Sequence, residues 1–378
     1  MQIQEESQAA KHVLFKMSGV LLMLIDLSSC GETCERSMRK VAMKSAKAKS
    51  HKFRKKILIA LTALVVTAII ALGVVAYGPV KTLASLEKVD DFPLYVMRYH
   101  GTYLFDWFAE EGIEWGPYRK LYETVNPAAC TSFAALNEAG DAVFGRNLDW
   151  QHRSSMLLFT DPPNGYASVS MVDLYYLGFE GMQEIPWGKR LPLLATPYAT
   201  IDGMNECGVA MSQNAVLRRN APADPNRPTL LNSQMIRLVL DQAKDVDEAL
   251  DLIRQYNVDF ADVCVHFHIA DASGKSAIVE YIDGGMAILR NDKPWQVSTN
   301  FLLSEPQQPD CWRYKKATKA LAEMQGKASQ NEAMNLLQAT SQDHTVWSVV
   351  YNLSSGEIRL AMGKDYNKVY SFRLKMKN

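Results

Sequence analysis

The chain has 378 residues, of which 48% are hydrophobic and 22% are charged, so it can bury a substantial core and is not disordered by composition. Its 41 Lys and Arg residues balance its 41 Asp and Glu residues, and this zero net charge argues against a nucleic-acid-binding protein. Six cysteines in a chain of this length do not make the dense framework of a disulfide-rich domain.

The first 42 residues carry weak signals. Residues 20–27 are apolar but too short to cross a bilayer, and the sequence that leads to Cys30 matches a lipidation site only loosely. Cys30 and Cys34 lack the two further ligands that a zinc site requires. Translation from Met43 is therefore left open.

An uncharged apolar run follows at residues 57–77. As a helix rising 1.5 Å per residue it would span about 30 Å, the thickness of a bilayer's hydrocarbon core, so we expect a transmembrane helix. Seven Lys and Arg residues lie just before the run, so the positive-inside rule places residues 1–56 in the cytoplasm. The rest would lie outside, at the cell surface or in the periplasm. A cleaved signal peptide, giving a secreted protein, is the alternative.

Residues 78–129 are expected to form a pro-segment or linker, with an aromatic helical stretch around 103–108. The segment ends at Pro127, Ala128 and Ala129, where proline interrupts regular structure and small residues leave the backbone accessible. The chain is therefore suited to cleavage here. Residues 130–378 are expected to form the main folded domain.

That domain begins with a predicted β-hairpin. Apolar runs at 131–136 and 142–148 flank a polar turn that contains a glycine, and a bend near 138–140 brings Cys130 opposite Arg146 and Asp149. A guanidinium favours a thiolate and a carboxylate can orient a proton carrier, so the three groups suit an activated sulfur nucleophile. The alternative is a buried cysteine beside a structural ion pair.

The remaining chain is predicted to contain two groups of strands separated by helices. Strands are expected where apolar or alternating runs lie between turn residues, at 199–201, 208–213, 263–270, 277–282, 286–289, 296–300, 346–353, 357–362 and 369–374. Helices are expected where apolar residues recur every three or four positions, at 231–243, 246–254, 312–324 and 331–339. This order predicts an α+β protein in which two antiparallel sheets pack together with helices outside.

Two histidines and three cysteines have alternative roles. His266 and His268 lie two apart on one strand, but no third ligand accompanies them, so we expect packing or polar-face residues rather than a metal site. Cys207, Cys264 and Cys311 are expected to be small buried hydrophobic residues, and their disulfide state is left open.

Four short motifs occur in a fixed order along the main domain. They are Cys-Thr-Ser at Cys130 with Gly-Arg-Asn-Leu-Asp-Trp downstream, Asp-Gly-Met-Asn-Glu at 202–206 leading to Asn214, Ser-Thr-Asn ending at Asn300, and Cys-Trp-Arg-Tyr containing Arg313. With these motifs the sequence resembles the choloylglycine hydrolase and acid ceramidase-like family of N-terminal nucleophile hydrolases.

The resemblance implies a four-layer αββα fold, hydrolysis of linear amides, a small-molecule N-acyl amide substrate, and neither a cofactor nor a catalytic metal. It implies that Cys130 becomes an N-terminal residue, because a free α-amine with a typical pKa of about 7.7–8.0 can accept the thiol proton. Self-cleavage after Ala129 would therefore be required. Asp149 would hydrogen-bond the amine, and Arg146 would lie beside the sulfur.

The resemblance also implies a set of supporting residues. Asn300 would donate from its side chain to the oxyanion, Asn214 would provide a second donor by backbone or side chain, and Arg313 would organise the charges beneath the site. A homo-oligomer is left open.

Two other functions are compatible with these residues. The same thioester intermediate would serve an acyltransferase that passes the acyl group to an amine, and the fold could instead form a non-catalytic surface module. The aromatic and Met-containing stretch at 171–176 could line an acyl pocket, although the identity of the acyl group and amine is left open.

Overall fold

The structure is a computed structural model of the chain. It describes residues 55–56, 58–67, 73–111, 129–151, 154–179, 181, 184–217, 221, 223–260, 263–282, 285–307 and 309–377. The chain divides into two compact units, Met1–Ala71 and Leu72–Asn378. The second unit contains the fold and the candidate site.

The predicted transmembrane helix over residues 57–77 is not confirmed. Helical residues cover 58–67 and 73–84, whereas residues 57 and 68–72 lie outside the described part. Within the described ranges, no helix combines the length and the apolar character needed to cross a membrane. The predictions for Cys30, Cys34 and the basic segment before residue 55 also lie outside the described residues.

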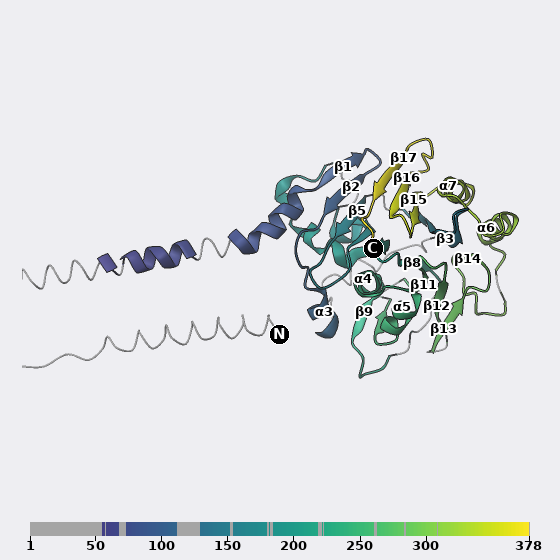
Figure 1. Cartoon of the computed structure of the whole chain (residues 1–378), viewed down its shortest axis with the longest axis horizontal. Helices are drawn as coiled ribbons and strands as arrows, with labels where there is room; N and C mark the ends of the chain where they lie inside the picture. The colour runs from purple at the N-terminus through teal and green to yellow at the C-terminus, as the bar shows by residue number, and fades with distance from the viewer. Residues whose placement is uncertain are drawn as a thin grey trace, which may run out of the picture. The chain divides into compact units, whose positions relative to one another are not determined.

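The larger sheet has nine strands in the order β1-β2-β5-β6-β7-β8-β11-β12-β13 (Figure 1). Its strands are β1 (Glu87–Asp90), β2 (Leu94–Arg98), β5 (Ser155–Thr160), β6 (Ser168–Asp173), β7 (Thr200–Asn205), β8 (Ala210–Ala215), β11 (Val265–Ala270), β12 (Ser276–Ile282) and β13 (Gly285–Arg290). Neighbours run antiparallel except β2 and β5, which are parallel. A separate two-stranded sheet pairs β9 (Thr229–Leu231) with β10 (Asn257–Asp259).

The smaller sheet has six strands in the order β14-β3-β4-β15-β16-β17. Its strands are β14 (Gln296–Ser298), β3 (Ala129–Leu136), β4 (Ala142–Asp149), β15 (Thr345–Asn352), β16 (Glu357–Met362) and β17 (Val369–Arg373). All five neighbouring pairs are antiparallel. The hairpin of β3 and β4 is therefore flanked by β14 on one side and by the meander β15-β16-β17 on the other.

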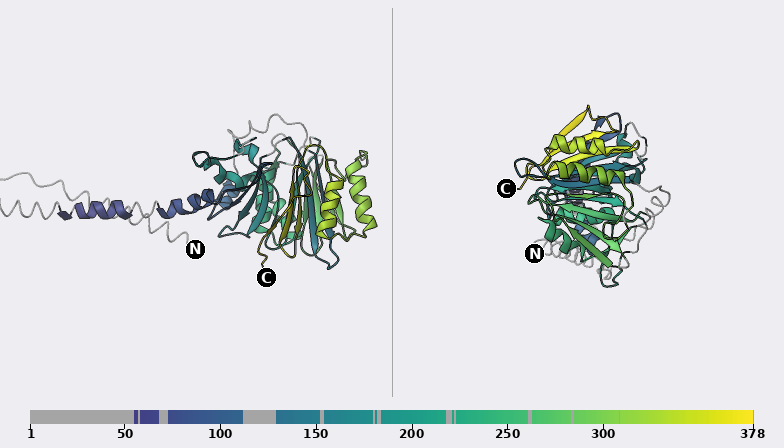
Figure 2. Two further views of the ribbon diagram at one scale, coloured as in Figure 1. Left: turned by 90° about the horizontal axis from the view of Figure 1, so that it is seen from above. Right: turned by 90° about the vertical axis from the view of Figure 1, so that its right-hand side faces the viewer.

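The two sheets pack face to face with helices on both outer faces (Figure 2). Phe144 and Trp347 of the smaller sheet share a buried core with Leu157 and Met204 of the larger sheet. On the outer face of the larger sheet lie α3 (Phe105–Glu111), α4 (Asn232–Gln242) and α5 (Val246–Ile253). On the outer face of the smaller sheet lie α6 (Trp312–Glu323) and α7 (Gln330–Ala339). The predicted α+β class is confirmed.

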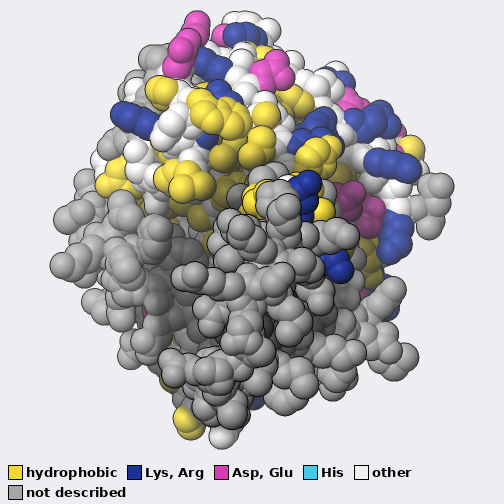
Figure 3. All heavy atoms as spheres, turned by 90° about the vertical axis from the view of Figure 1, so that its left-hand side faces the viewer, with side chains coloured by type: hydrophobic (Ala, Val, Ile, Leu, Met, Phe, Trp, Pro, Cys, Tyr) yellow, Lys and Arg dark blue, Asp and Glu magenta, His cyan; other side chains and the backbone are white. Residues whose placement is uncertain are grey.

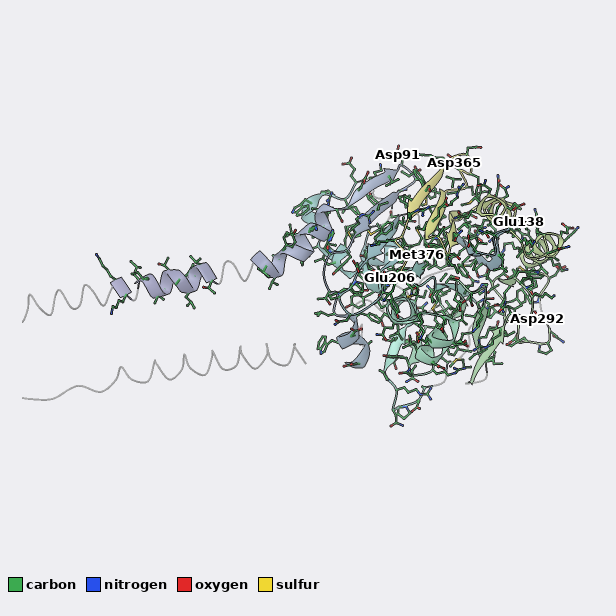
Figure 4. The ribbon with its side chains drawn as sticks, in the orientation of Figure 1. Asp91, Glu138, Glu206, Asp292, Asp365 and Met376 are labelled. Atoms are coloured by element: carbon green, nitrogen blue, oxygen red, sulfur yellow. The ribbon has the colours of Figure 1, made fainter. Side chains whose placement is uncertain are left out.

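The predicted hairpin that opens at Cys130 is confirmed. Cys130 lies opposite Leu148, and Gly140 in the turn has φ +88°, a value that side chains disfavour. A Cβ atom on Gly145 would lie 2.4 Å from the ring of Phe133, so glycine is required for the two strands to pack. Glu138 in the turn lies beside the α6 and α7 helices (Figure 4).

Part of residues 78–129, the expected pro-segment or linker, belongs to the fold. Strand β2 pairs with β5 inside the larger sheet, and Leu94 and Met97 on it are fully buried. Helix α3 contributes Phe105 and Ala109 to the core around α4. Residues 112–128, which precede the expected cleavage site, lie outside the described part.

Several other elements differ from the sequence expectations. Strands β5 and β6 were not predicted, and both are buried along their whole length, so they lack the polar alternation that marks a half-exposed strand. The strand expected at 199–201 begins one residue later, after a 3₁₀ helix, η5 (Leu191–Ala199). Two shorter 3₁₀ helices, η3 (Leu174–Leu177) and η4 (Trp187–Lys189), precede it.

Candidate active site

Cys130 lies at the second position of β3 and is almost completely buried, with 1% of its surface exposed. Its sulfur lies 3.4 Å from Nη2 of Arg146. Burial raises the pKa of the thiol, and the opposing effect of the Arg146 guanidinium is smaller. Arg146 lies beside the sulfur and lowers the pKa of the thiol, but burial outweighs this effect in the uncleaved chain.

The guanidinium of Arg146 is held by groups of the larger sheet. Its Nε lies 3.2 Å from Oδ2 of Asp202, and its Nη2 donates to the carbonyl oxygen of Gln213 at 2.7 Å. Asp202 also accepts hydrogen bonds from the hydroxyl of Tyr351 at 2.6 Å and from Nε1 of Trp347 at 3.2 Å. Burial raises the pKa of the Asp202 carboxyl, although Arg146 and these donors oppose it. Asp202 thus fixes Arg146 beside the sulfur.

Asp149 lies at the end of β4, on the opposite side of the hairpin from Cys130. Oδ1 accepts from the hydroxyl of Thr345, and Oδ2 accepts from Nε2 of Gln342 at 2.7 Å. Nη1 of Arg313 lies 3.9 Å from Oδ2. Burial raises the pKa of this carboxyl against these contacts. The predicted hydrogen bond from the Cys130 nitrogen to Asp149 is not the one that the uncleaved chain makes.

Asn300 takes that hydrogen bond instead. The backbone N–H of Cys130 donates to Oδ1 of Asn300 at 2.7 Å, and Nη2 of Arg313 donates to the same oxygen at 2.7 Å. Two donors at one atom identify it as the amide oxygen. Nδ2 of Asn300 consequently donates to the carbonyl oxygen of Ala215 at 2.8 Å. In the uncleaved chain the predicted oxyanion donor is thus an acceptor for the Cys130 nitrogen.

Arg313 contacts the start of the hairpin. Besides Asn300, it donates to the carbonyl oxygen of Cys130 and to the hydroxyl of Thr131 at 3.0 Å. Only 7% of its surface is exposed. Arg313, in the first turn of α6, therefore contacts the backbone of β3, the strand that carries Cys130.

Asn214 points away from the sulfur. Its Nδ2 donates to the hydroxyls of Ser132 and Ser298 at 2.9 Å each, so the predicted side-chain donor is engaged elsewhere. The next residue along β8, Ala215, hydrogen-bonds the Cys130 sulfur through its backbone and lowers the pKa of the thiol against the larger effect of burial. The backbone donor at the sulfur is therefore one residue later than the sequence motif suggested.

A pocket opens beside the sulfur and contains about 580 Å³ of empty space, including its mouth. Its lining is mainly apolar and includes a few polar groups. The lining residues are Cys130, Arg146, Leu148, Trp150, Asp173, Tyr176, Ala199, Ile201, Gln213, Ala215, Asn232, Ser233, Val263 and Val265. Of the predicted stretch at 171–176, Asp173 and Tyr176 belong to this lining. Such a pocket suits an organic group with an apolar body.

His266, His268, Cys207, Cys264 and Cys311 do not line the pocket beside the Cys130 sulfur. His266 and His268 are fully buried between the sheets, and the carboxylate of Glu280 lies 3.1 Å from Nδ1 of His266, a partner that sequence reasoning missed. The part of the chain that the structure describes holds no group of three or more His, Cys, Asp or Glu side chains able to bind a metal. In the described part of the chain, Cys207, Cys264 and Cys311 form no disulfide bond.

Comparison with known proteins gives one family match. The model of the family described as acyl-coenzyme A:6-aminopenicillanic acid acyl-transferase matches residues 136–367. The matched range is 232 of the 378 residues (367 − 136 + 1). It begins six residues after Cys130, so it includes Arg146, Asp149, Asn300 and Arg313 but not the cysteine itself.

Similarity to individual proteins is more distant. A penicillin V acylase of Pectobacterium atrosepticum is 26% identical over 194 residues, which is 46% of this chain and 49% of that protein. The chain thus spans about half the length of this curated relative.

Two solved structures are also similar. The penicillin V acylase of Agrobacterium tumefaciens has a TM-score of 0.49 at 20% identity, covering 65% of this chain and 86% of its own. A variant of the conjugated bile acid hydrolase of Clostridium perfringens has a TM-score of 0.49 at 15% identity, covering 66% and 93%.

Proposed function

Because this chain belongs to the acyl-coenzyme A:6-aminopenicillanic acid acyl-transferase family, we propose that it hydrolyses linear amide bonds of N-acyl compounds with Cys130 as the nucleophile. The resemblance to choloylglycine hydrolases and penicillin acylases, inferred from the sequence motifs, is confirmed at the level of the family. We assign the four layers to the N-terminal nucleophile hydrolase fold.

One observation carries the proposal: both reactive atoms of Cys130 are held at a pocket. Asn300 accepts from its nitrogen, while Arg146 lies beside its sulfur. The same residue lines the pocket together with Ala215. An N-terminal cysteine needs this arrangement, because its nitrogen acts as the base and its sulfur as the nucleophile.

The uncleaved chain is latent in this proposal. The nitrogen of Cys130 is a peptide amide and cannot accept a proton. Attack of the Cys130 sulfur on the Ala129 carbonyl carbon would form a thioester and release the amine. Water would then cleave the thioester, giving an Ala129 carboxylate and a Cys130 that carries a free α-amine.

Amide hydrolysis would repeat this chemistry on a substrate. The α-amine takes the thiol proton, the sulfur attacks the substrate carbonyl, and the amine leaves with a proton from the α-ammonium. The N–H of Ala215 and the guanidinium of Arg146 are the donors nearest the sulfur, so we assign oxyanion stabilisation to them. Water then hydrolyses the S-acyl intermediate and restores Cys130.

Acyl transfer is the second candidate function. The matching family is described as an acyl-transferase, and the same thioester can be cleaved by an amine in place of water. The two activities differ only in the acceptor. Product analysis with and without an added amine therefore separates them, whereas a non-catalytic module would give neither product.

We also retain the proposal that residues 57–77 anchor the chain in a membrane, with the main domain outside the cytoplasm. It is supported by the positive charge before this run and by exposed apolar side chains within it, including Leu58 and Ile59. Figure 3 shows one face of the molecule on which hydrophobic side chains gather among Lys and Arg. Protease protection in intact cells would test this topology.

Intact-mass and N-terminal analysis of the purified full chain tests the mechanism. We expect a new N-terminus at Cys130 in the wild type, together with turnover of a set of N-acyl 4-nitroanilides bearing aromatic and alkyl acyl groups. Cys130→Ala should remain uncleaved and inactive, whereas the matched control Cys207→Ala should behave as wild type. Turnover by a chain that keeps the bond between Ala129 and Cys130 would contradict the α-amine mechanism.

A further inference from the structure

Polar side chains interrupt the apolar interface between the two sheets, directly behind the candidate site. Ser132 and Ser298 lie opposite each other on β3 and β14 of the smaller sheet. Asn214 and His266 lie opposite each other on β8 and β11 of the larger sheet. All four are fully buried, and burying polar groups costs free energy unless they are hydrogen-bonded to one another.

Asn214 joins the two sheets. Its single Nδ2 group donates to Ser132 and to Ser298 at 2.9 Å each and so uses both of its protons. Ser132 extends the network to Nδ1 of His268 at 3.0 Å. One amide therefore ties β8 of the larger sheet to the paired strands β3 and β14 of the smaller sheet.

His266 continues the network toward Asn300. Its Nε2 lies 2.9 Å from the hydroxyl of Ser298 and 2.8 Å from the carbonyl oxygen of Thr299, to which it donates. Its Nδ1 lies 3.1 Å from Glu280. Because Thr299 immediately precedes Asn300, His266 fixes the backbone from which the acceptor of the Cys130 nitrogen projects.

Each strand tied in this way carries a group of the candidate site next to the tie. Ser132 follows Cys130 by two residues, Ser298 precedes Asn300 by two residues, and Asn214 immediately precedes Ala215. A small change in the spacing of these strands would move the sulfur, the nitrogen acceptor and the backbone donor relative to one another. A misplacement of about 1 Å can cost roughly a hundredfold in rate.

We propose that Asn214, Ser132, Ser298 and His266 are positioning residues that hold these three strands in the spacing needed for self-cleavage and amide hydrolysis. The inference rests on the proposed function. It assigns Asn214 a different role from direct donation to the oxyanion, because both protons of its Nδ2 are already used behind the site.

The two roles of Asn214 predict different behaviour of its partners. If Asn214 positions strands, removing a hydroxyl that it binds should reproduce part of the effect of removing Asn214 itself. If its side chain donates to the oxyanion, the serines should matter little. Asn214→Ala, Ser132→Ala, Ser298→Ala and the double variant Asn214→Ala with Ser298→Ala therefore form the test.

The experiment uses the full chain and the N-acyl 4-nitroanilide that the wild type turns over fastest. We expect about a tenfold to hundredfold fall in kcat for Asn214→Ala and about a tenfold fall for each serine variant, with KM within about twofold of wild type. The double variant should fall by less than the product of the two single effects, since both changes break the hydrogen bond between Asn214 and Ser298. The rate of self-cleavage should fall in parallel. Ser298→Thr, which keeps the hydroxyl group, should keep both rates near those of the wild type.

Ser212→Ala is the matched control, since Ser212 lies on the same face of β8 two residues before Asn214 and its buried hydroxyl has no hydrogen-bond partner. It should leave both rates unchanged. A loss confined to Asn214→Ala, with wild-type rates for both serine variants, would overturn the inference. Full additivity in the double variant would overturn it as well. A wild type that neither self-cleaves nor turns over any substrate would instead refute the proposed function.

Discussion

The six-stranded sheet and the nine-stranded sheet contribute different kinds of groups to the candidate site. Cys130, Arg146 and Asp149 lie on a single hairpin of the smaller sheet, within 20 residues of chain (149 − 130 + 1). The larger sheet meets this hairpin with the carboxylate of Asp202 and the carbonyl of Gln213. The reacting groups are thus local in sequence, whereas the groups that orient them come from distant strands.

A nearby cation is not enough to lower the pKa of the buried Cys130 thiol below its ordinary value. Arg146 touches the sulfur, yet its charge is shared with Asp202, and burial prevails in setting the pKa of the thiol. In the proposed mechanism, activation comes instead from the free α-amine that cleavage would create, which would supply a base within the same residue.

The largest expected effect tests whether the larger sheet really fixes Arg146. Asp202→Asn keeps the size of the side chain but leaves the buried guanidinium without its charge partner, which should cost about 3–5 kcal/mol in the free energy of unfolding. Urea denaturation measures this. Breaking the exposed pair of Arg254 and Asp251 with Arg254→Met should cost less than about 1 kcal/mol, and equal losses would remove the distinction.

A second variant tests which sheet supplies the oxyanion donor. Asn300→Ala should lower kcat by about 10²–10³, whichever role Asn300 has. Asn300→Asp separates the roles, because aspartate keeps the oxygen that accepts from Cys130 but has no N–H to donate. We expect Asn300→Asp to retain at least about tenfold more activity than Asn300→Ala.

If Asn300→Ala and Asn300→Asp are equally inactive, Asn300 would instead be assigned as the donor to the oxyanion. Asn226→Ala, at an exposed turn, serves as the control and should keep the kcat of the wild type. Steady-state rates with one N-acyl substrate suffice for all three variants.

A third variant tests whether the chain before Cys130 is structural. Met97 on β2 is fully buried in an apolar cluster with Leu83 and Leu193, so Met97→Ala should cost about 3 kcal/mol in the free energy of unfolding. If residues 78–111 were a dispensable linker, the change would be silent. Val80→Ala, on an exposed position of the same segment, should have an effect below about 0.5 kcal/mol.

The smallest expected effect depends on pH. Burial disfavours the charge of Glu280, but hydrogen bonds from His266, Ser304 and the backbone of Leu303 outweigh it and hold the pKa of this carboxyl below its ordinary value. The stabilisation is therefore present above the ordinary glutamate pKa and is lost as pH falls through the lowered pKa. Glu280→Gln should cost about 2 kcal/mol at pH 7.

The stability gap between wild type and Glu280→Gln should then close below about pH 4, as measured by urea denaturation across pH. A gap that is constant from pH 7 to pH 3 would contradict the assignment. The exposed Glu332, whose pKa is also lowered by its bonds to Ser329, gives the matched comparison in Glu332→Gln.

The hairpin and most of the later elements were predictable because each rests on local sequence. Alternating runs and a glycine turn determine which residues face Cys130, and helices α4 to α7 follow from apolar spacing. The contact between Arg146 and Asp202 was not predictable, because it joins residues 56 positions apart on different sheets. A signal existed in the motif at 202–206, which begins within β7, but its first residue was not recognised as a charge partner.

The role of Asn300 could not be read from sequence for a different reason. The motif predicts that Asn300 lies at the site, but which end of its amide faces the sulfur depends on Arg313 and on the nitrogen of Cys130. Asn214 shows the same limit, since alternation along β8 turns its side chain behind the site. Strands β5 and β6 were missed because both are buried along their whole length and lack the polar alternation of a half-exposed strand.

The position of β2 has a consequence for the protein once the chain is cut before Cys130. This strand belongs to the first product, yet it lies inside the larger sheet beside β5 of the second product. The mature protein would be two polypeptides that share one sheet, and its melting temperature would rise with protein concentration, as for any two-chain assembly that dissociates on unfolding. Dilution alone would then lower the stability of the cut protein, whereas the stability of the uncut precursor would not depend on protein concentration.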